Sequence, residues 1–377
     1  MNSATNHTAF VSGNADDPQA LIVVFLRGGA DGLTLVAPVE DDDYHRARPR
    51  IAVSKSAALK LDEVFGLNPL MADLHPLYQE GELAIVHSAG SEDDTRSHFE
   101  AQDLMEHGGF VAGGWLGRFL RARPRTQGGA LSAVAVGREL PECLRGAPSA
   151  AVMQSIDEFT LGKGSAPLTQ ALERLYAPQK DQLGQAARDT IDALGRLDRL
   201  RGTPYQPAHG AVYGKDSFAL GLQQVARLIK TRVGLEAASV DLGGWDSHFT
   251  QGTLIQPLMT RLAQGLAAFH RDLGAAMRHT TVVVMTEFGR RVQENASFGT
   301  DHGRGSAMFV LGGGVKGGRV LGGWTGLKGV ALEGPGDLPV RHNYRNVLAP
   351  VLARQGIRDG FEQIFPGFNL APMDVYG

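Results

Sequence analysis

The sequence predicts an α/β fold, in which helices cover a central sheet of buried, mostly parallel strands. Three observations carry this prediction. Short, continuously apolar runs rich in β-branched residues recur along the chain, several of them are separated by segments with a helical period, and most end in glycine-rich turns. The chain has 377 residues and is 43% hydrophobic, which is enough for a large packed core.

The elements follow from local pattern. Strands are predicted, in chain order, at residues 21–26, 83–87, 131–136, 237–242, 280–285 and 307–311. Helices that cover the sheet are predicted at 182–200, 217–233, 254–277 and 344–353, because apolar residues recur there every three or four positions. Pro350 is expected to kink or divide the last helix. A peripheral strand is expected at 156–161 and a hairpin arm at 318–323.

The domain organisation is expected to be simple. Residues 1–20 are polar and are predicted to form a flexible lead, and residues 21–377 are predicted to form a single domain with an excursion around 147–180. No basic segment followed by an apolar one marks a signal peptide, and no apolar run approaches the ~20 residues of a membrane span. As written, the sequence predicts a cytoplasmic protein without a membrane span.

Composition excludes several classes of function. The net charge is -3, so a basic footprint for nucleic acid is absent. The single cysteine, Cys143, excludes an internal disulfide framework and a cysteine-rich zinc site. The glycine-rich turn after the first strand lacks the G-x-G-x-x-G spacing of a dinucleotide site.

Polar residues follow most of the predicted strands and indicate a metal site. They are Asp31, the turn from Thr95 to His98, Asp246 with His248, Glu287, and Asp301 with His302 in the loop before 307–311. Parallel strands bring their carboxyl ends to one edge, where so many carboxylates and imidazoles would be costly without a shared cation. Mixed nitrogen and oxygen donors favour Zn or Mn, and all-oxygen sets favour Mg or Ca. We therefore expect a divalent metal, Zn first. The alternative is turn and cap residues joined in a satisfied ion-pair network.

Cationic and hydroxyl side chains lie at the same strand ends. Arg27, Arg96, Arg290 and Arg304 could bind a phosphate, sulfate or carboxylate group, or could instead neutralise Asp31 or Glu287. Thr95 or Ser97 lies close to the start of a helix predicted from Phe99, where an anion is stabilised. Each hydroxyl could equally be an ordinary N-cap.

Five motifs together resemble those of a known family. They occupy residues 24–33, 96–101, 244–248, 286–290 and 301–303, and they occur in the same order as in the domain of unknown function 1501 family. This family belongs to the alkaline phosphatase-like (sulfatase-like) superfamily. The resemblance extends over roughly residues 21–353.

The resemblance implies a three-layer α/β/α fold with a metal site and a hydroxyl nucleophile at a helix N-terminus. By position, Asp31 resembles a metal ligand of the first strand, Asp246, His248 and His302 the ligands of one metal, and Ser97, or else Thr95, the nucleophile. His98 could serve as base, ligand or helix-start residue. Glu287 stands where the pair for a second metal begins, but Phe288 occupies the position expected for its histidine. Many family members carry a twin-arginine export signal, whose removal would make this protein periplasmic.

These residues lead to two hypotheses of function. The first is a metal-dependent hydrolase of a phosphate or sulfate ester, or a related transferase, acting on an anionic small molecule or a polysaccharide ester. The second is a non-catalytic binding or scaffold protein on a degenerate phosphatase-like fold, which Phe288 favours.

Overall fold

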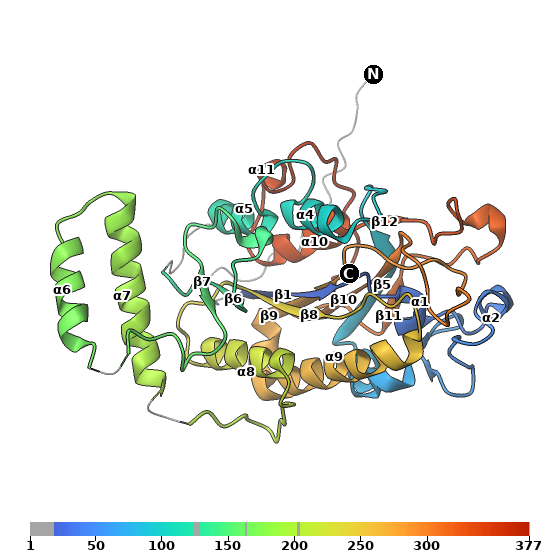
Figure 1. Ribbon diagram of the computed structural model, residues 1–377, viewed down its shortest axis with the longest axis horizontal. Helices are drawn as coiled ribbons and strands as arrows, with labels where there is room; N and C mark the ends of the chain where they lie inside the picture. Colours follow the sequence, from blue (N-terminus) through green and yellow to red (C-terminus); the bar gives the residue numbers. More distant parts are fainter. Residues whose placement is uncertain (1–18, 124–128, 163, 202–203, 377) are drawn as a thin grey trace.

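A sheet with helices on both faces forms the centre of the protein (Figure 1). The computed structural model describes residues 19–123, 129–162, 164–201 and 204–376. Residues 1–18, which make up most of the predicted flexible lead, lie outside the described residues. The predicted three-layer α/β/α fold with a mostly parallel central sheet is confirmed.

The sheet contains nine strands among the described residues, in the order β11-β5-β10-β9-β1-β8-β6-β7, with β12 paired to β5. The predicted apolar runs supply its main strands. β1 and β9 lie in one sheet, as predicted, and they pair directly and in parallel. The bounds are β1 Ala20–Arg27, β5 Leu83–Gly90, β6 Ala133–Val136, β7 Ala151–Met153, β8 Ala237–Gly243, β9 Thr280–Met285, β10 Ser306–Gly312, β11 Arg319–Leu321 and β12 His342–Asn343.

One strand direction differs from the expectation. β10 was expected to be parallel to its neighbours, but it runs antiparallel to both β5 and β9. The physical reason is the connection from β9, which contains no helix that could cross back over the sheet, whereas parallel neighbours need such a crossover. The amino end of β10 therefore lies at the same edge as the carboxyl ends of β1, β5, β8 and β9. This direction places the loop with Asp301 and His302 at that edge.

One face of the sheet is covered by α8 (Ser217–Lys230), α9 (Gln251–Leu273), the 3-10 helix η1 (Pro69–Leu74) and α3 (His75–Gln79). Alternate residues of β1, Ile22, Val24 and Leu26, point into this core. The helix predicted at 254–277 is confirmed as α9. Leu262, Leu266 and Phe269 of its apolar stripe are fully buried, whereas Leu254 near its start is exposed.

The other face is covered by α4 (His98–His107), α5 (Trp115–Ala122), α10 (Tyr344–Arg354) and α11 (Phe361–Ile364). Leu21, Val23 and Phe25 of β1 point into this second core. Helix α10 continues through Pro350, so this proline does not divide the helix, which was one of its two expected effects. α4 begins at His98 directly beyond β5, and this places its N-terminus at the carboxyl edge of the sheet.

Three sequence predictions away from this edge are wrong in part. The helix predicted at 182–200 is α7 (Gln182–Arg201), but it pairs with α6 (Ala166–Tyr176) and projects from the body, and only its second half reaches the core (Figure 1). Residues 156–161 form turns and bends and no strand. The edge of the sheet beside β6 is occupied instead by β7, which begins five residues before position 156. The expected hairpin arm at 318–323 is β11, which instead pairs in parallel with β5.

Smaller elements complete the fold. Three short strands form a second sheet in the order β2-β4-β3. The remaining bounds are β2 Val36–Ala37, β3 Leu59–Lys60, β4 Gly66–Leu67, α1 Gly32–Leu35, α2 Asp42–Ala47, η2 Glu142–Leu144, η3 Gly274–His279 and η4 Gly329–Ala331.

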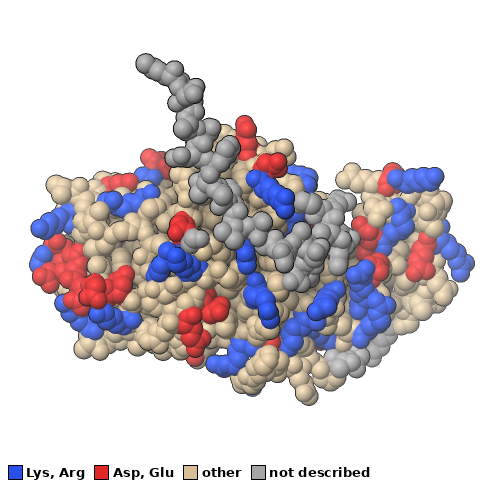
Figure 2. Space-filling view, turned by 180° about the vertical axis from the view of Figure 1, so that it is seen from behind, with Lys and Arg blue, Asp and Glu red and all other residues tan. Residues whose placement is uncertain are grey.

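The distribution of charged side chains on the surface agrees with the small net charge of -3. Acidic and basic side chains are interspersed over the face shown in Figure 2. None of the helices in the described parts of the chain is long and apolar enough to cross a membrane.

Candidate metal centre

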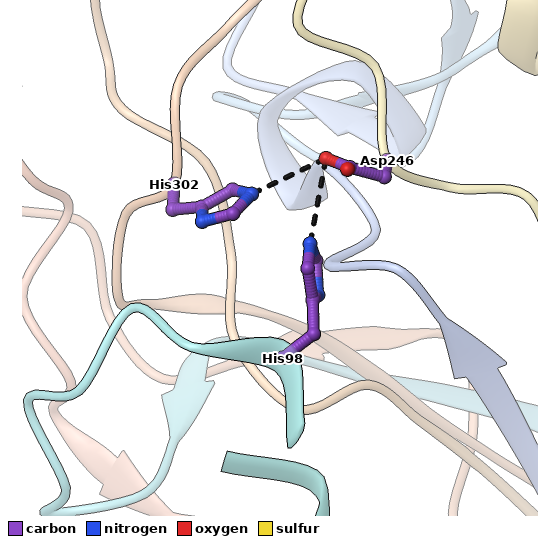
Figure 3. Close-up of side chains that lie close together, drawn as sticks. All are labelled: His98, Asp246 and His302. Carbon is purple, nitrogen blue, oxygen red and sulfur yellow. Dashed lines mark hydrogen bonds and ion pairs between the residues drawn. The ribbon is translucent and has the colours of Figure 1, made fainter. Parts of the chain in front are cut away.

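Four side chains converge at the carboxyl edge of the sheet. Asp246 and His248 follow β8, His98 is the first residue of α4 beyond β5, and His302 lies in the loop before β10. The loops after β5 and β8 and the loop before β10 meet here because β10 is antiparallel. Figure 3 shows how His98 and His302 point toward Asp246.

The distances within this cluster are short. Asp246 Oδ1 lies 3.4 Å from His98 Nε2, 3.1 Å from His248 Nε2 and 3.2 Å from His302 Nε2. His248 Nε2 and His302 Nε2 are 2.9 Å apart. Among the described residues, the donor atoms of His98, Asp246 and His302 all lie within 4.8 Å of one another. His248 is outside this set of three, but its Nε2 atom lies next to two of the donors, Asp246 Oδ1 and His302 Nε2.

Each imidazole is held from behind through its other nitrogen. His98 Nδ1 is 2.8 Å from Glu287 Oε1, and His302 Nδ1 is 2.8 Å from the carbonyl oxygen of Arg96. A carbonyl or an ionised carboxylate can only accept, so both Nδ1 atoms carry the proton and donate it. In the neutral ring Nε2 is then a lone pair directed at the cluster.

His248 is held in the same way. Its Nδ1 lies 3.2 Å from Asp301 Oδ1, which also accepts a hydrogen bond from Asn295. Two Nε2 lone pairs 2.9 Å apart, those of His248 and His302, repel each other unless a cation or a proton lies between them. The Nε2 atom of His98 is buried and has no hydrogen-bond partner in the described part of the chain. A cation among these lone pairs would relieve the repulsion and would also contact His98 Nε2.

A divalent metal fits this donor set. Ligand atoms bound to tetrahedral Zn at ~2.0–2.1 Å lie roughly 3.3 Å from one another, and the three contacts of Asp246 Oδ1 span 3.1 to 3.4 Å. Nitrogen donors suit Zn or Mn better than Mg or Ca. Outer acceptors on every imidazole are the usual support of a metal-bound histidine. About half of the Asp246 side chain is exposed, so the centre is open to solvent.

The protonation of the cluster reflects the same contacts. Burial opposes ionisation of Asp246, but the hydrogen bond from the Arg290 guanidinium and its positive charge lower the pKa of Asp246 to about 2. The hydrogen bond to Glu287 raises the pKa of His98, whereas burial lowers the pKa of His302. Burial also opposes ionisation of Glu287, yet hydrogen bonds from His98 and Gln102 lower its pKa overall. Both carboxylates are thus ionised at neutral pH.

Glu287 and Phe288 do not form a second metal site. Glu287 is buried and accepts hydrogen bonds from His98, Gln102 and the backbone of Gly28, so it orients His98 and is not itself in the cluster. The Phe288 ring packs against His98 and His302, with ring centroids 4.8 and 4.9 Å away. The position where the family resemblance places a second histidine is therefore an apolar wall beside the cluster.

Asp31, predicted as a metal ligand, lies outside the cluster. It is the N-cap of α1, and its carboxylate forms a bidentate ion pair with Arg48, at 2.5 and 3.1 Å. Thr34 and Gln251 donate to it as well. Burial opposes ionisation, but Arg48 lowers the pKa of Asp31 overall. A buried guanidinium, and not a metal, neutralises this carboxylate.

The four arginines predicted to bind substrate are held by protein groups. Arg27 contacts Asp241 and Glu106, and Arg96 pairs with Asp337. Arg304 pairs with Glu333 at 2.7 Å. Arg290 is fully buried and donates to Asp246 and to the carbonyl oxygens of Gly28, Gly29, Trp245 and Thr300. The contacts support the alternative role, in which the arginines neutralise and brace protein groups, but none of the four pairs with Asp31 or Glu287, the carboxylates expected for that role.

The predicted hydroxyl residues lie at the start of α4. Ser97 is the N-cap, half-buried, and its side chain makes no cap hydrogen bond. Thr95 donates to Glu100 at 2.8 Å and accepts from the backbone of Ser97. Ser97 therefore adjoins His98 with a hydroxyl that the helix does not use, whereas Thr95 is occupied.

Sequence reasoning missed the residues that organise this edge. Arg48 and Gln251 lie in segments with no motif, and Gln102 appears only as one polar residue of a helix. The single available signal was the spacing of Gln102 four residues after His98, which places both on one side of α4 and lets both reach Glu287.

Comparisons with known proteins agree with the sequence motifs. The family described as "Protein of unknown function (DUF1501)" matches residues 87–357. No curated protein sequence matches the chain.

Several solved structures have a similar arrangement at low identity. The C-terminal periplasmic domain of EcEptC from Escherichia coli, in complex with Zn, has 10% identity over 92% of this chain and 82% of that chain, with a TM-score of 0.39. The sulfatase BT1596, a 2-O GAG sulfatase, has 8% identity over 92% and 72%, with a TM-score of 0.40. The alkaline phosphatase from the Antarctic bacterium TAB5 has 9% identity over 79% and 92%, with a TM-score of 0.27.

Proposed function

The chain belongs to the DUF1501 family of proteins of unknown function, and from this premise we propose that it is a metal-dependent hydrolase of a phosphate or sulfate ester. The observation that carries the proposal is the convergence of three imidazole Nε2 atoms on Asp246 Oδ1. Groups of this kind, each anchored from behind, are built to hold a cation. His98, Asp246, His248 and His302 would hold it, with Zn first among the candidates.

A bound divalent metal would supply Lewis acidity, which neutralises an anionic ester and lowers the pKa of a hydroxyl group. The chain supplies the remaining parts. Glu287 and Asp301 keep His98 and His248 in one tautomer and orientation. The open side of Asp246 admits the ester, and the Phe288 wall keeps water from the opposite side of the imidazoles.

Ser97 is the proposed nucleophile. Its hydroxyl precedes the first ligand and is not consumed by capping α4. The N-terminus of α4 stabilises negative charge on that oxygen or on the ester. Ser97 Oγ would lose its proton and bond to phosphorus or sulfur as the bond to the ester oxygen breaks, and the departing alkoxide would take up one proton to leave as the alcohol. Water would then release the free anion and restore the serine.

A second function, non-catalytic binding, is favoured by the arginines. Arg27, Arg96, Arg290 and Arg304 are all engaged with protein groups, so none of the four is free to clamp an anionic ester. On this alternative the metal would be structural, and the edge would bind a polysaccharide or a protein partner without turnover.

Metal analysis of the purified protein followed by a panel of aryl phosphate and sulfate esters tests the proposal. We expect close to one equivalent of metal per protein, and we expect it to be lost in His98→Ala and His302→Ala. His75→Ala is the control and should retain the metal, because His75 hydrogen-bonds to the carbonyl oxygen of Lys60 and is not part of the cluster. Ser97→Ala should lower kcat by about three orders of magnitude or more, as nucleophile removal does in other hydrolases. Metal binding without turnover of any ester would favour the binding function, and absence of metal would refute both.

A further inference from the structure

A cavity opens at the carboxyl edge of the sheet, beside the candidate metal centre. It has a volume of about 450 Å³ and lies between α4 and residues 137–142, which follow β6. Its floor is formed by the ends of β1, β6 and β8, on the face of the sheet that α4 covers (Figure 1). Ligands of open α/β sheets bind in crevices outside the carboxyl ends of the strands, so this α4 cavity is placed where a ligand is expected.

Small side chains on the floor leave the space open. Ala135 of β6 and Ser239 of β8 are neighbours across the paired strands, and both line the cavity. Ser239 is 4% exposed, and its hydroxyl has a single contact, with the Cys143 thiol 4.0 Å away. Among the described residues no nitrogen or oxygen accepts from this hydroxyl. A buried polar group of the floor therefore has an unused hydrogen-bond donor, which a polar ligand could fill.

One side chain joins the α4 cavity to the metal centre. Gln102 lines the cavity and follows His98 by four residues, which is about one turn or roughly 6 Å along α4. Its Nε2 atom donates to Glu287 Oε1 at 2.8 Å, the same oxygen that holds His98, and its Oε1 atom accepts from Arg27 at 3.1 Å. The cavity is therefore within reach of the alcohol part of an ester whose anionic group lies at the metal centre.

Arg27 does not balance the carboxylates around it. Its guanidinium pairs with Glu106 at 2.5 Å and with Asp241 at 2.6 Å, so one cation faces two carboxylates. Glu106 is buried, whereas 42% of the Asp241 side chain is exposed. Arg27 contacts Asp241 through Oδ2, and no described residue donates to Asp241 Oδ1. One oxygen of this carboxylate is therefore open to a ligand.

The other charged side chains of the α4 cavity add to its negative charge. Asp103 and Glu139 are exposed at its rim, and their carboxylates form no ion pair or hydrogen bond with a described residue. Arg138 is the only further cation in the lining, and Glu142 pairs with Arg145 outside it. The lining thus carries a net negative charge, and a recess lined mainly by one sign of charge concentrates ligands of the opposite sign.

We propose that the α4 cavity binds an ammonium group in the alcohol part of the substrate, while the metal centre holds the phosphate or sulfate group. Asp241 is the acceptor for the ammonium group, and Asp103 and Glu139 add to the attraction. This inference rests on the proposed function and narrows its substrate to an ester of a polar, amine-bearing alcohol.

Calorimetry on the Zn-loaded protein tests the assignment with two non-hydrolysable probes, 3-aminopropylphosphonate and propylphosphonate. Both carry a phosphonate for the metal, and only the first carries an ammonium group. The wild type should bind the amino probe about tenfold or more tightly than propylphosphonate, the usual effect of a charge-assisted hydrogen bond. Asp241→Asn should remove most of that preference and leave the affinity for propylphosphonate unchanged. Arg27 keeps Glu106 as its partner in this variant.

Asp73→Asn is the matched control. It removes the same charge from η1, on the opposite face of the sheet, and should leave both affinities unchanged. Equal affinity of the wild type for the two probes, or an unchanged preference in Asp241→Asn, would overturn the assignment. If Asp241→Asn does not fold, Asp103→Asn at the exposed rim gives the same comparison, with a smaller expected loss.

Propylamine titrated into chelator-treated protein distinguishes a failure of this assignment from a failure of the proposed function. Saturable binding that Asp241→Asn weakens would support the α4 cavity even if no metal were bound and no ester were hydrolysed. Metal binding and ester turnover without any preference for the amino probe would support the proposed function and refute the cavity assignment.

Discussion

Replacing Asp31 by asparagine should destabilise the fold strongly without affecting the metal. Asparagine has the same shape, so packing is preserved and only the charge is lost. Arg48 is completely buried and donates twice to Asp31, at 2.5 and 3.1 Å. Its other acceptors, the carbonyl oxygens of Arg291 and Val292 and the Thr34 hydroxyl, carry no charge. Asp31→Asn therefore leaves a buried, uncompensated guanidinium.

The expected loss is about 3–5 kcal/mol, the range seen when one partner of a buried ion pair is removed. Whole domains are stable by only ~5–15 kcal/mol, so the effect should be large in a urea titration. The double variant Asp31→Asn with Arg48→Met should regain a good part of it, because the unpaired charge is then gone. Asp216→Asn, at the N-cap of α8, is the control, since asparagine caps as well as aspartate.

Urea titrations in the presence of a chelator and in the presence of added Zn distinguish two possible roles of Asp31, as the ion-pair partner of Arg48 and as a metal ligand. Because Asp31 pairs with Arg48, the loss should be the same in both conditions, and the affinity for Zn should not change. A loss below about 1 kcal/mol in chelator would contradict the buried-pair argument. A loss that appears only with Zn would show that Asp31 is a ligand after all.

Three further predictions concern the site and the core. Glu287→Gln should weaken metal binding by about 10–100-fold in a chelator competition, because the carboxylate that orients His98 loses its charge. An unchanged affinity would show that Glu287 does not support His98 as a metal ligand. Burial lowers the pKa of His87 to about 4, so the unfolded chain takes up a proton first, and stability should fall by about 3 kcal/mol as the pH drops from ~6.5 to ~4. His87→Phe should flatten that slope in denaturation at several pH values, and an identical slope would refute the assignment. Gly29→Ala should lower both the stability of the fold and the affinity for metal. Gly29 has a φ of +67°, and an added Cβ would lie 2.6 Å from the Phe288 ring, which packs on His98 and His302. A melting temperature equal to that of the wild type would contradict this prediction.

The sequence alone determined the layers and the edge that carries the site. Buried strands such as β1 and β9 are continuous apolar runs, and α9 has an unbroken helical period, because local pattern reports directly on burial. Asp246, His248 and His302 were recognisable because each follows or precedes such a strand within a few residues. The chain neighbours of a strand end cannot lie far from it.

Tertiary structure decided which of the polar residues act together. Asp31 and Arg48 are 17 positions apart, and nothing local shows that the guanidinium folds back onto the carboxylate. The antiparallel direction of β10 depends on the connection from β9, and it alone brings His302 to face Asp246. Likewise Arg290 and Arg291 are adjacent in sequence, yet Arg290 is buried and donates several hydrogen bonds, whereas Arg291 is partly exposed and forms an ion pair with Asp337. Ion pairs and hydrogen bonds such as these join residues that are far apart in the sequence, and the local periodicity of the sequence contains no information about them.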